Sequence, residues 1–442
     1  MPESSSHVSP GTKRSQAVAW ALWDTGSAGV SAVVVTFVFS VYLTGAVGKG
    51  LHGGTPPASW LGRALAIAGL TIAVLAPVIG VWVEDPRRRR LTLTMLTGLV
   101  VGLVSAMSLI RERPEYLWAG LALLAVAAAC GDLASVPYNA MLRQLTTPQN
   151  SGRISGFGLA AAFVGSVGLL LVVYFGCIDG KGTTRGFLHL PVGDGMNVRI
   201  AMLVAAGWFV TFATPLLLTA HNLPSSTAEV EAPARSALGG YRRLWQDLVG
   251  EWHRDRNLVY YLLSSAVFRD GLAGVFTFGG VLGVNAYGIA PDDVLIFGVA
   301  ASVVAALGAV FGGFLDDWIG SKPVILGSLA CIIAAGLAMM AMSGPRAFWA
   351  TGLLLCLFIG PAQASARTLL LRMSSDGKEG VAFGLYTMTG RAVSFVAPWL
   401  FSVFVDVFGA VRAGMGGLCL VMIVGLLGLV MVRAPHRVAT AD

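Results

Sequence analysis

The sequence has few charged residues. Lys and Arg number 30 and Asp and Glu 23 among 442 residues, so charged residues make up only 12%. A typical soluble domain carries about 25%. Apolar residues make up 55%, and a soluble protein of this length could not cover its surface with so few charges. The same composition excludes disordered, collagen-like and coiled-coil chains. An integral membrane protein remains.

Cysteine is also scarce, and sequence motifs of enzymes are missing. The five cysteines include no C-x-x-C pair, which argues against a disulfide framework and a zinc site. The sequence has no H-E-x-x-H, P-loop, Rossmann fingerprint or G-x-S-x-G motif. We therefore expect neither an enzyme nor an ATP-driven pump, and no cofactor or metal. The net charge of +7 is spread between apolar runs, so it indicates membrane orientation rather than nucleic-acid binding.

Long apolar runs dominate what is present. Each is near the length of ~20 residues that a helix needs to cross a ~30 Å hydrocarbon core. Continuous runs exclude a β-barrel, whose strands alternate in hydrophobicity. The sequence thus predicts an all-α integral membrane protein with twelve transmembrane helices. The predicted spans are 17–44, 60–83, 91–110, 116–140, 154–176, 198–219, 258–287, 293–315, 322–343, 347–370, 381–408 and 411–432.

The distribution of basic residues predicts the orientation. If the N-terminus is inside, the inner loops and tails hold 19 of the 30 Lys and Arg residues and the outer loops hold 9. This bias predicts that both termini are cytoplasmic, in a multi-pass protein of the plasma membrane. The dense run Arg87–Arg90 is interpreted as a loop anchored at anionic lipid headgroups.

The longest loop divides the spans six and six. We expect a tail at 1–16, a first six-helix bundle at 17–219, a linker at 220–257, a second bundle at 258–432 and a tail at 433–442. Leu238, Tyr241, Trp245, Leu248 and Trp252 recur at helical spacing, which predicts an amphipathic helix in the linker. That helix would lie on the inner leaflet or pack on the protein as a strut.

The two halves resemble each other. Trp23–Val30 in the first run is similar to Arg269–Val275 in the seventh. Gly131 with Leu142-Arg143 matches Gly360 with Leu371-Arg372, and Phe157-Gly158-Leu159 matches Phe383-Gly384-Leu385. Two six-helix parallel repeats around a midplane site are the architecture of a transporter.

The loop between the eighth and ninth runs carries the most specific local signal. Its sequence from Gly313 to Lys322 resembles the major facilitator loop signature G-x-L-x-D-x-x-G-[RK]-[RK]. Gly313 would allow close helix approach and Gly320 a tight turn. Asp317 would accept hydrogen bonds from helix N-terminal amides or pair with a cation to hold one gate state, and Lys322 would anchor the loop at the headgroups.

The first half has a divergent counterpart of this loop. It starts at Gly80 and has Glu84 at the acidic position, with Asp85 as the alternative acid, and its arginines, including Arg88, follow. Arg87 stands where the second glycine belongs. The alternative for both loops is that they serve only as positively charged anchors on the inner side.

More of the chain resembles one branch of the major facilitator superfamily, which contains the autophagy-related vacuolar amino-acid effluxers and bacterial relatives. The resemblance lies in Trp20–Asp24, Pro137–Ala140, Gly152–Gly156, Phe268–Gly271, Gln363–Arg367 and Phe383–Tyr386. It departs from the family at Trp23, where Tyr is usual, and at Arg269, where a neutral residue is common. The resemblance implies a secondary carrier with two six-helix bundles, and amino-acid efflux in its fungal relatives.

Ionisable residues inside the bilayer are costly, which makes them candidates for function. Asp270 lies about 13 residues into its run, or ~19 Å, and Arg391 about 10 residues, or ~15 Å, at 1.5 Å per residue. Arg269 or Arg391 could bind a substrate carboxylate, and a buried carboxyl could take up the coupling proton. Structural ion pairs between helices are the alternative. The candidates for substrate binding or coupling are Asp24, Asp132, Arg269, Asp270, Gln363, Arg367 and Arg391.

These features together predict a secondary active transporter that moves a small solute by alternating access, coupled to protons. The resemblance favours an amino acid or another carboxylate as the substrate. Its partners would be that solute, membrane lipids and a co-transported proton, and it would act as a monomer. The alternative is a protein of the same fold that does not transport solutes or that handles lipids, such as a receptor, an assembly factor or a flippase.

Overall fold

The computed structural model describes residues 10–48, 57–147, 149–180, 182–219, 256–289, 291–375 and 377–433. The predicted amphipathic helix at 238–252 lies outside these residues, as do the linker up to 255 and the residues after 433. Helix begins at Pro10, so the first helix takes in part of the predicted N-terminal tail.

The first bundle contains six membrane-spanning segments, and several of them change helix type along their length. The first span is continued by π-helical and α-helical pieces after Ser31, and the fifth ends in a π-helical turn. A two-stranded antiparallel sheet, in which Thr184 pairs with Pro191, follows the fifth span. The elements are α1 (Pro10–Ser31), η1 (Ala32–Phe37), α2 (Phe39–Tyr42), η2 (Leu43–Val47), α3 (Pro57–Trp82), α4 (Pro86–Met107), η3 (Pro114–Tyr116), α5 (Leu117–Ala140), α6 (Leu142–Leu145), α7 (Ser151–Val173), η4 (Tyr174–Ile178), β1 (Thr184–Arg185), β2 (Leu190–Pro191), η5 (Gly193–Gly195) and α8 (Met196–Thr219).

The second bundle also has six spans, and its fifth span is broken into two helices. The break falls between Val393 and Val396. The elements are α10 (Arg256–Tyr287), α11 (Pro291–Ile319), α12 (Ser321–Ala341), α13 (Pro345–Met373), α14 (Glu379–Val393), α15 (Val396–Phe408), η7 (Val411–Ala413) and α16 (Gly414–Met431).

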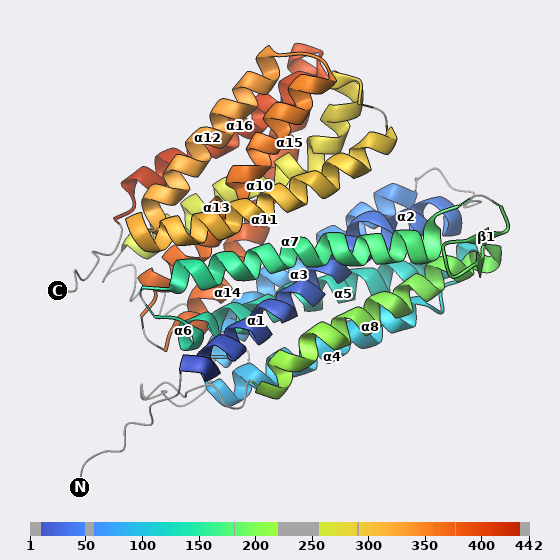
Figure 1. Cartoon of the computed structure of the whole chain (residues 1–442), viewed down its shortest axis with the longest axis horizontal. Coiled ribbons are helices and arrows are strands. Elements are labelled where there is room, and N and C mark those ends of the chain that lie inside the picture. The colour runs from blue at the N-terminus through green and yellow to red at the C-terminus, as the bar shows by residue number, and fades with distance from the viewer. Residues whose placement is uncertain are drawn as a thin grey trace, which may run out of the picture.

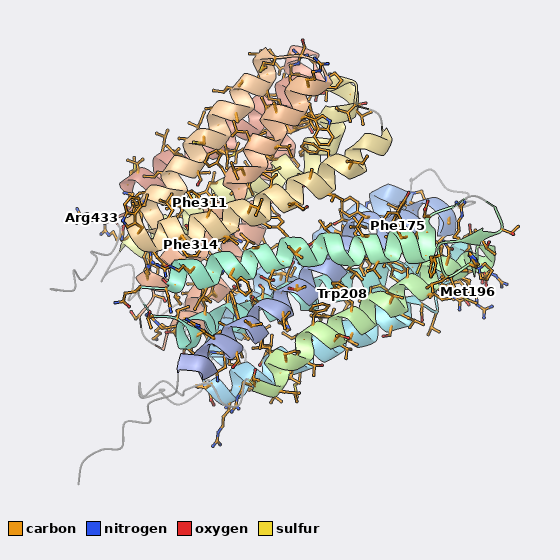
Figure 2. The ribbon with its side chains drawn as sticks, viewed as in Figure 1. Phe175, Met196, Trp208, Phe311, Phe314 and Arg433 are labelled. Atoms are coloured by element: carbon orange, nitrogen blue, oxygen red, sulfur yellow. The ribbon has the colours of Figure 1, made fainter. Side chains whose placement is uncertain are left out.

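These helices are those of a membrane protein. Within the described residues, eleven segments are long and apolar enough to cross a bilayer. The remaining long helix, α10, spans 32 residues but carries Arg269 and Asp270 near its middle, which lower its hydropathy. Large apolar side chains cover the outer faces of the bundles, for example Phe175 and Phe311, which are 56% and 69% exposed (Figure 2). The prediction of an all-α fold with twelve spans is confirmed.

The two bundles form a V. They converge at the end of the molecule where α1 begins and α16 ends, and they diverge toward the end that carries β1 (Figure 1). Two pairs of helices make most of the contact between the bundles: α7 packs on α11, and α3 packs on α14. We call the convergent end, where α1 begins and α16 ends, the terminal end.

A buried aromatic stack fixes the helices that carry the polar residues of the first bundle. The ring of Tyr138 lies between Trp20 and Trp23, with centroid distances of 4.5 Å to each. The indole N–H of Trp20 donates to the backbone oxygen of Tyr138 at 3.0 Å, and that of Trp23 donates to the Thr97 hydroxyl at 3.1 Å. Buried indole groups that are both packed and hydrogen-bonded have little freedom to move. The stack therefore ties α1 to α4 and α5 and sets the position of Asp24.

Candidate functional site

A cavity of about 360 Å³ lies in the first bundle and reaches α14 of the second. Ile72 and Phe209 contribute to its apolar walls. Its polar lining comes from six side chains, which are Asp24, Ser27, Ser31, Asp132, Ser135 and Arg391. A mostly apolar cavity with a few convergent polar groups is the usual form of a small-molecule site.

The cavity holds an ion pair that joins the bundles. A guanidinium nitrogen of Arg391 on α14 contacts a carboxylate oxygen of Asp132 on α5. Both side chains are accessible, with 39% and 37% of their surface exposed. A solute that enters the cavity can therefore reach both charges. The structure brings these two sequence-predicted candidates together.

A second arginine of the second bundle, Arg367 on α13, inserts deeply into the first bundle. Its Nε donates to the Ser155 hydroxyl at 3.1 Å, and its Nη2 donates to the Ser155 backbone oxygen at 2.7 Å. Its Nη1 donates to the Asn139 side-chain oxygen at 3.2 Å and lies 3.8 Å from a carboxylate oxygen of Asp24. Its guanidinium carbon lies 5.0 Å from the centroid of the Trp20 ring. Asp24 thus belongs both to the cavity and to the contact between bundles.

The candidates on α10 have contacts within their own bundle. Arg269 stacks on the ring of Tyr386 at 3.6 Å and donates to the Tyr386 backbone oxygen at 3.2 Å. Asp270 is buried and accepts a 2.6 Å hydrogen bond from the backbone N–H of Ala397, in the first turn of α15. A carboxylate at a helix N-terminus satisfies free amides and stabilises the helix. Asp270 therefore holds the start of the broken half-span, and neither residue is among the described residues that line the cavity.

Gln363 is the remaining candidate from the sequence. It lies on α13 one helical turn before Arg367 and is half-buried. It is also outside the cavity lining formed by the described residues.

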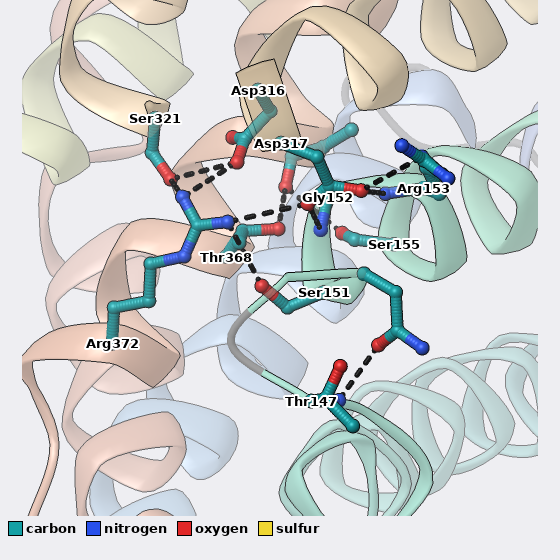
Figure 3. Close-up of polar contacts among 12 residues, drawn as sticks. Thr147, Ser151, Gly152, Arg153, Ser155, Asp316, Asp317, Ser321, Thr368 and Arg372 are labelled. Atoms are coloured by element: carbon teal, nitrogen blue, oxygen red, sulfur yellow. Dashed lines mark hydrogen bonds and ion pairs between the residues drawn. The ribbon is translucent and has the colours of Figure 1, made fainter. Parts of the chain in front are cut away.

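The signature loop between α11 and α12 makes contacts across the bundle interface (Figure 3). The two oxygens of Asp317 accept hydrogen bonds from the backbone N–H groups of Gly152 and Arg153 at the start of α7, at 2.8 and 3.0 Å. Arg372 on α13 lies 2.7 Å from Asp316 and 3.3 Å from Asp317, and it donates to the Ser151 hydroxyl at 3.0 Å. Four charged or polar side chains from the two bundles, Asp316, Asp317, Arg372 and Ser151, thus meet in one cluster.

Two glycines of this loop have the expected backbone geometry, while its lysine does not lie where the sequence suggested. Gly320 has φ 97°, which favours glycine. A Cβ on Gly313 would lie 2.6 Å from the Gly152 backbone oxygen. Lys322, expected to anchor the loop at lipid headgroups, instead donates to the Val430 and Val432 backbone oxygens at 2.9 and 2.6 Å. The ammonium group thus provides hydrogen bonds to backbone carbonyls at the end of α16, where a helix leaves its last carbonyls without partners. No local sequence pattern predicts this contact.

In the first-half loop the two neighbouring acids have different surroundings. Asp85 is the N-cap of α4 and accepts from the Arg87 backbone N–H at 2.8 Å. Glu84 is buried, and its backbone lies beside α14, because a Cβ added to Gly380 would lie 3.4 Å from the Glu84 backbone nitrogen. Arg88 lies over the Trp82 ring at 4.0 Å. Asp85 therefore acts on its own helix, whereas Glu84 lies where the two bundles meet.

The interpretation of Arg87–Arg90 as headgroup anchors is wrong for Arg89. Its side chain is buried, donates to the backbone oxygens of Val83 and Ala140 at 2.9 and 3.2 Å, and lies 3.8 Å from Glu379. Arg143 donates to the same Glu379 carboxylate at 2.7 Å and to the Ser374 backbone oxygen at 2.7 Å. This cluster was not predicted from the sequence. The match of Leu142-Arg143 to Leu371-Arg372 was a usable signal, because Arg372 lies in the corresponding cluster at the loop between α11 and α12.

The two helix contacts between the bundles, α7 with α11 and α3 with α14, resemble each other because glycines allow close backbone approach in both. A Cβ on Gly156 of α7 would lie 2.3 Å from the Ala309 backbone oxygen, and a Cβ on Gly384 of α14 would lie 2.7 Å from the Ala76 oxygen. Gly80 approaches the Gly380 oxygen in the same way that Gly313 approaches Gly152.

These contacts correct the sequence match between the fifth and eleventh runs. They make Gly156 the counterpart of Gly384, whereas matching Phe157 to Phe383 pairs Gly158 with Gly384. The burial of the two phenylalanines agrees with the correction, since Phe157 is 46% exposed to its surroundings and Phe383 only 1%.

Solved structures with the same arrangement are major facilitator transporters. The chain aligns with the proton:xylose symporter XylE with a TM-score of 0.72, 14% identity and 96% of each chain covered. It aligns with the transporter FucP in its outward conformation with a TM-score of 0.71, 11% identity, and 95% of this chain and 99% of that one covered. The chain therefore has the fold of the major facilitator transporters.

The sequence comparisons identify the branch. The family described as "Vacuole effluxer Atg22 like" matches residues 58–442, and the chain belongs to this family. An uncharacterised MFS-type transporter of Bacillus subtilis, YxiO, is 22% identical over 423 residues, which is 95% of each chain. Autophagy-related protein 22-1 of Neosartorya fischeri is 22% identical over 287 residues. That alignment spans 59% of this chain and 45% of the fungal protein. The predicted superfamily and branch are confirmed.

Proposed function

We propose that this protein is a secondary active transporter of the plasma membrane that moves an amino acid or another small carboxylate, coupled to protons, by alternating access. The observation that carries the proposal is the cavity in which Asp132 and Arg391 meet from opposite bundles. The relatives add to it: the family description names an effluxer, and XylE is described as a proton symporter.

The charges of the cavity suit this chemistry. The planar guanidinium of Arg391 can bind a carboxylate through two parallel hydrogen bonds. In the observed state the Asp132 carboxylate forms an ion pair with that guanidinium. A proton on Asp132 would remove the competing charge and free Arg391 for the substrate carboxylate. Proton uptake and substrate binding would then be linked, because both break the same ion pair.

The interface clusters would act as the gate. The contacts described for Asp317, Glu379 and Arg367 between the bundles lie at the terminal end, where the helices converge. The bias of basic residues predicts that the termini are cytoplasmic, so the observed state would open to the outside. Rocking of the bundles would break these clusters and open the cavity to the cytoplasm. The working unit in this proposal is a monomer.

Flux into proteoliposomes tests the proposal. Purified protein is reconstituted without ATP, and uptake of radiolabelled amino acids and other carboxylates is measured with and without an imposed pH gradient. We expect gradient-dependent uptake that Arg391→Gln abolishes. Arg412→Gln is the matched control, because Arg412 lies over the Tyr287 ring at 5.2 Å and outside the cavity lining. Uptake that needs ATP, or that Arg391→Gln leaves unchanged, contradicts the proposal.

A further inference from the structure

The surroundings of Arg367 have the form of a receptor for a cation. All three guanidinium nitrogens donate hydrogen bonds, and the charge lies over the face of Trp20. The acceptors are the Asn139 side chain and the hydroxyl and backbone oxygens of Ser155, with the Asp24 carboxylate at 3.8 Å. We call these groups, with the Trp20 ring, the Arg367 cradle.

The cradle and its occupant belong to different bundles. Trp20 and Asp24 lie on α1, Asn139 on α5 and Ser155 on α7, all in the first bundle, whereas Arg367 lies on α13 of the second. Trp20 is held by contacts within the first bundle, since it stacks on Tyr138 and donates to its backbone oxygen. The Ser155 hydroxyl donates to the Ala364 backbone oxygen of α13 at 2.9 Å, so this acceptor also contacts the second bundle. The first bundle therefore carries the groups of a cation site, and the second bundle carries the cation that fills it.

Separation of the bundles at the terminal end would empty this site. Arg367 would leave with α13, and the cradle would keep a carboxylate, three oxygen acceptors and an aromatic face. Leaving such a group of acceptors without a positive partner in a low-dielectric interior is costly. Asp24 also lines the cavity, so a solute in the cavity reaches the carboxylate that the cavity and the cradle share.

We propose that the Arg367 cradle is a binding site for the cationic group of the transported solute, a guanidinium or a primary ammonium. Arg367 is its internal competitor. The site is free when the bundles part at the terminal end, and Arg367 displaces the solute when they close. This inference rests on the proposed function, because it requires that the bundles alternate. It adds a positively charged group to the substrate, bound by the first bundle.

Chemical rescue tests the cradle without measuring transport. In Arg367→Ala the competitor is removed, while the Asp24, Asn139 and Ser155 oxygens remain. Methylguanidinium chloride is titrated into the purified full-length variant in nanodiscs, with sodium chloride at equal ionic strength as the reference, and the melting temperature is recorded. We expect a saturable rise for Arg367→Ala and none for the wild type, whose cradle is filled.

Variants of the two carboxylates that line the cavity give the matched control. Asp24→Asn in the Arg367→Ala background should weaken the apparent affinity for methylguanidinium about tenfold or more, as expected for loss of a charged hydrogen-bonding partner. Asp132→Asn in the same background should leave it unchanged, because Asp132 contacts Arg391 and not Arg367. If Arg367→Ala does not fold, Arg367→Gln serves instead, since its amide can still donate to the Ser155 oxygen.

Three outcomes would overturn the inference: no saturable response in either Arg367 variant, an equal response in the wild type, or a response that Asp24→Asn does not weaken. Failure of the proposed function is distinguishable from these. A protein that shows rescue but no solute flux keeps the cation site and loses the transport role, whereas flux of a solute without rescue keeps transport and rejects the cradle.

Discussion

The carboxylate of Glu379 and the guanidinium of Arg143 meet at 2.7 Å across the interface between the two bundles. The Glu379 side chain is only 5% exposed, and Arg89, which is 4% exposed, lies on it at 3.8 Å. One acid of the second bundle thus neutralises two cations of the first. Breaking a buried pair by removing one partner is more costly than the pair is stabilising, since the remaining charge is left without a counter-charge.

Glu379→Gln should therefore destabilise the observed state. In a double-mutant cycle with Arg143→Ala, we expect a coupling free energy within the range of ~0.5–3 kcal/mol that is seen for residues in one polar network. Thermal unfolding in nanodiscs gives the energies. Asp406→Asn is the control, because Asp406 lies exposed on α15. Additive effects of the two substitutions would contradict the prediction.

Gly156→Ala should shift the protein away from the observed state. The new methyl group would lie 2.3 Å from the backbone oxygen of Ala309, so α7 and α11 must separate. Overpacking of this kind costs about 1–3 kcal/mol, which changes a two-state equilibrium constant by roughly fivefold to somewhat over a hundredfold. Double electron–electron resonance between spin labels on the two bundles, placed at the terminal end, should show a longer distance. Gly98→Ala should not change it, since nothing lies within 4 Å of that position.

Asp317→Ala should loosen the same end of the molecule by a different route. It removes both acceptors for the Gly152 and Arg153 backbone N–H groups and one partner of Arg372. We expect faster labelling of an engineered cysteine at the start of α7 by a membrane-impermeant thiol reagent. Asp317→Asn keeps one acceptor oxygen and should give an intermediate rate. An unchanged rate in the alanine variant would show that these bonds do not hold the interface.

Two variants of Asp270 separate a structural role of this residue from a role in proton coupling. Asp270→Asn keeps an oxygen that can accept from Ala397, so its melting temperature should stay close to that of the wild type. Asp270→Ala leaves the first turn of α15 without this acceptor and should cost ~0.5–2 kcal/mol of stability, as for other helix caps. If gradient-driven uptake is lost in the stable Asp270→Asn variant, the residue couples transport and the capping role is not sufficient.

The sequence predicted the spans because length and hydropathy alone determine which segments cross a bilayer. It did not predict which way a polar residue within a span faces. Asp24 and Asp270 occupy matching places in the repeat, yet Asp24 meets Arg367 across the interface and Asp270 caps α15 in its own bundle. The break after Val393 makes this difference, because it creates a helix N-terminus that needs an acceptor. The local signal near that break is Pro398 in the first turn of α15, because a proline lacks the backbone N–H that a continuous helix would use there.

The polar clusters between the bundles were only partly predicted, because they depend on contacts between segments that lie far apart in the sequence. The signature at Gly313–Lys322 located one loop correctly, but the buried positions of Arg89 and Glu379 depend on each other and on α5. A run of four arginines has the composition of a surface anchor, and only packing shows that one of them points inward. Lys322 is similar, since its acceptors lie more than one hundred residues away, at the end of α16.

The eleventh span contacts both bundles. Its first helix, α14, lies against α3 of the first bundle through Gly380 and Gly384, and its second helix, α15, is tied to α10 through Asp270 (Figure 1). In the proposed rocking motion the two halves would follow different partners, and the short segment at Ser394–Phe395 would absorb the difference as a change in backbone torsion. A rigid, continuous helix at this place would resist the transition. The interruption would allow the span to bend there.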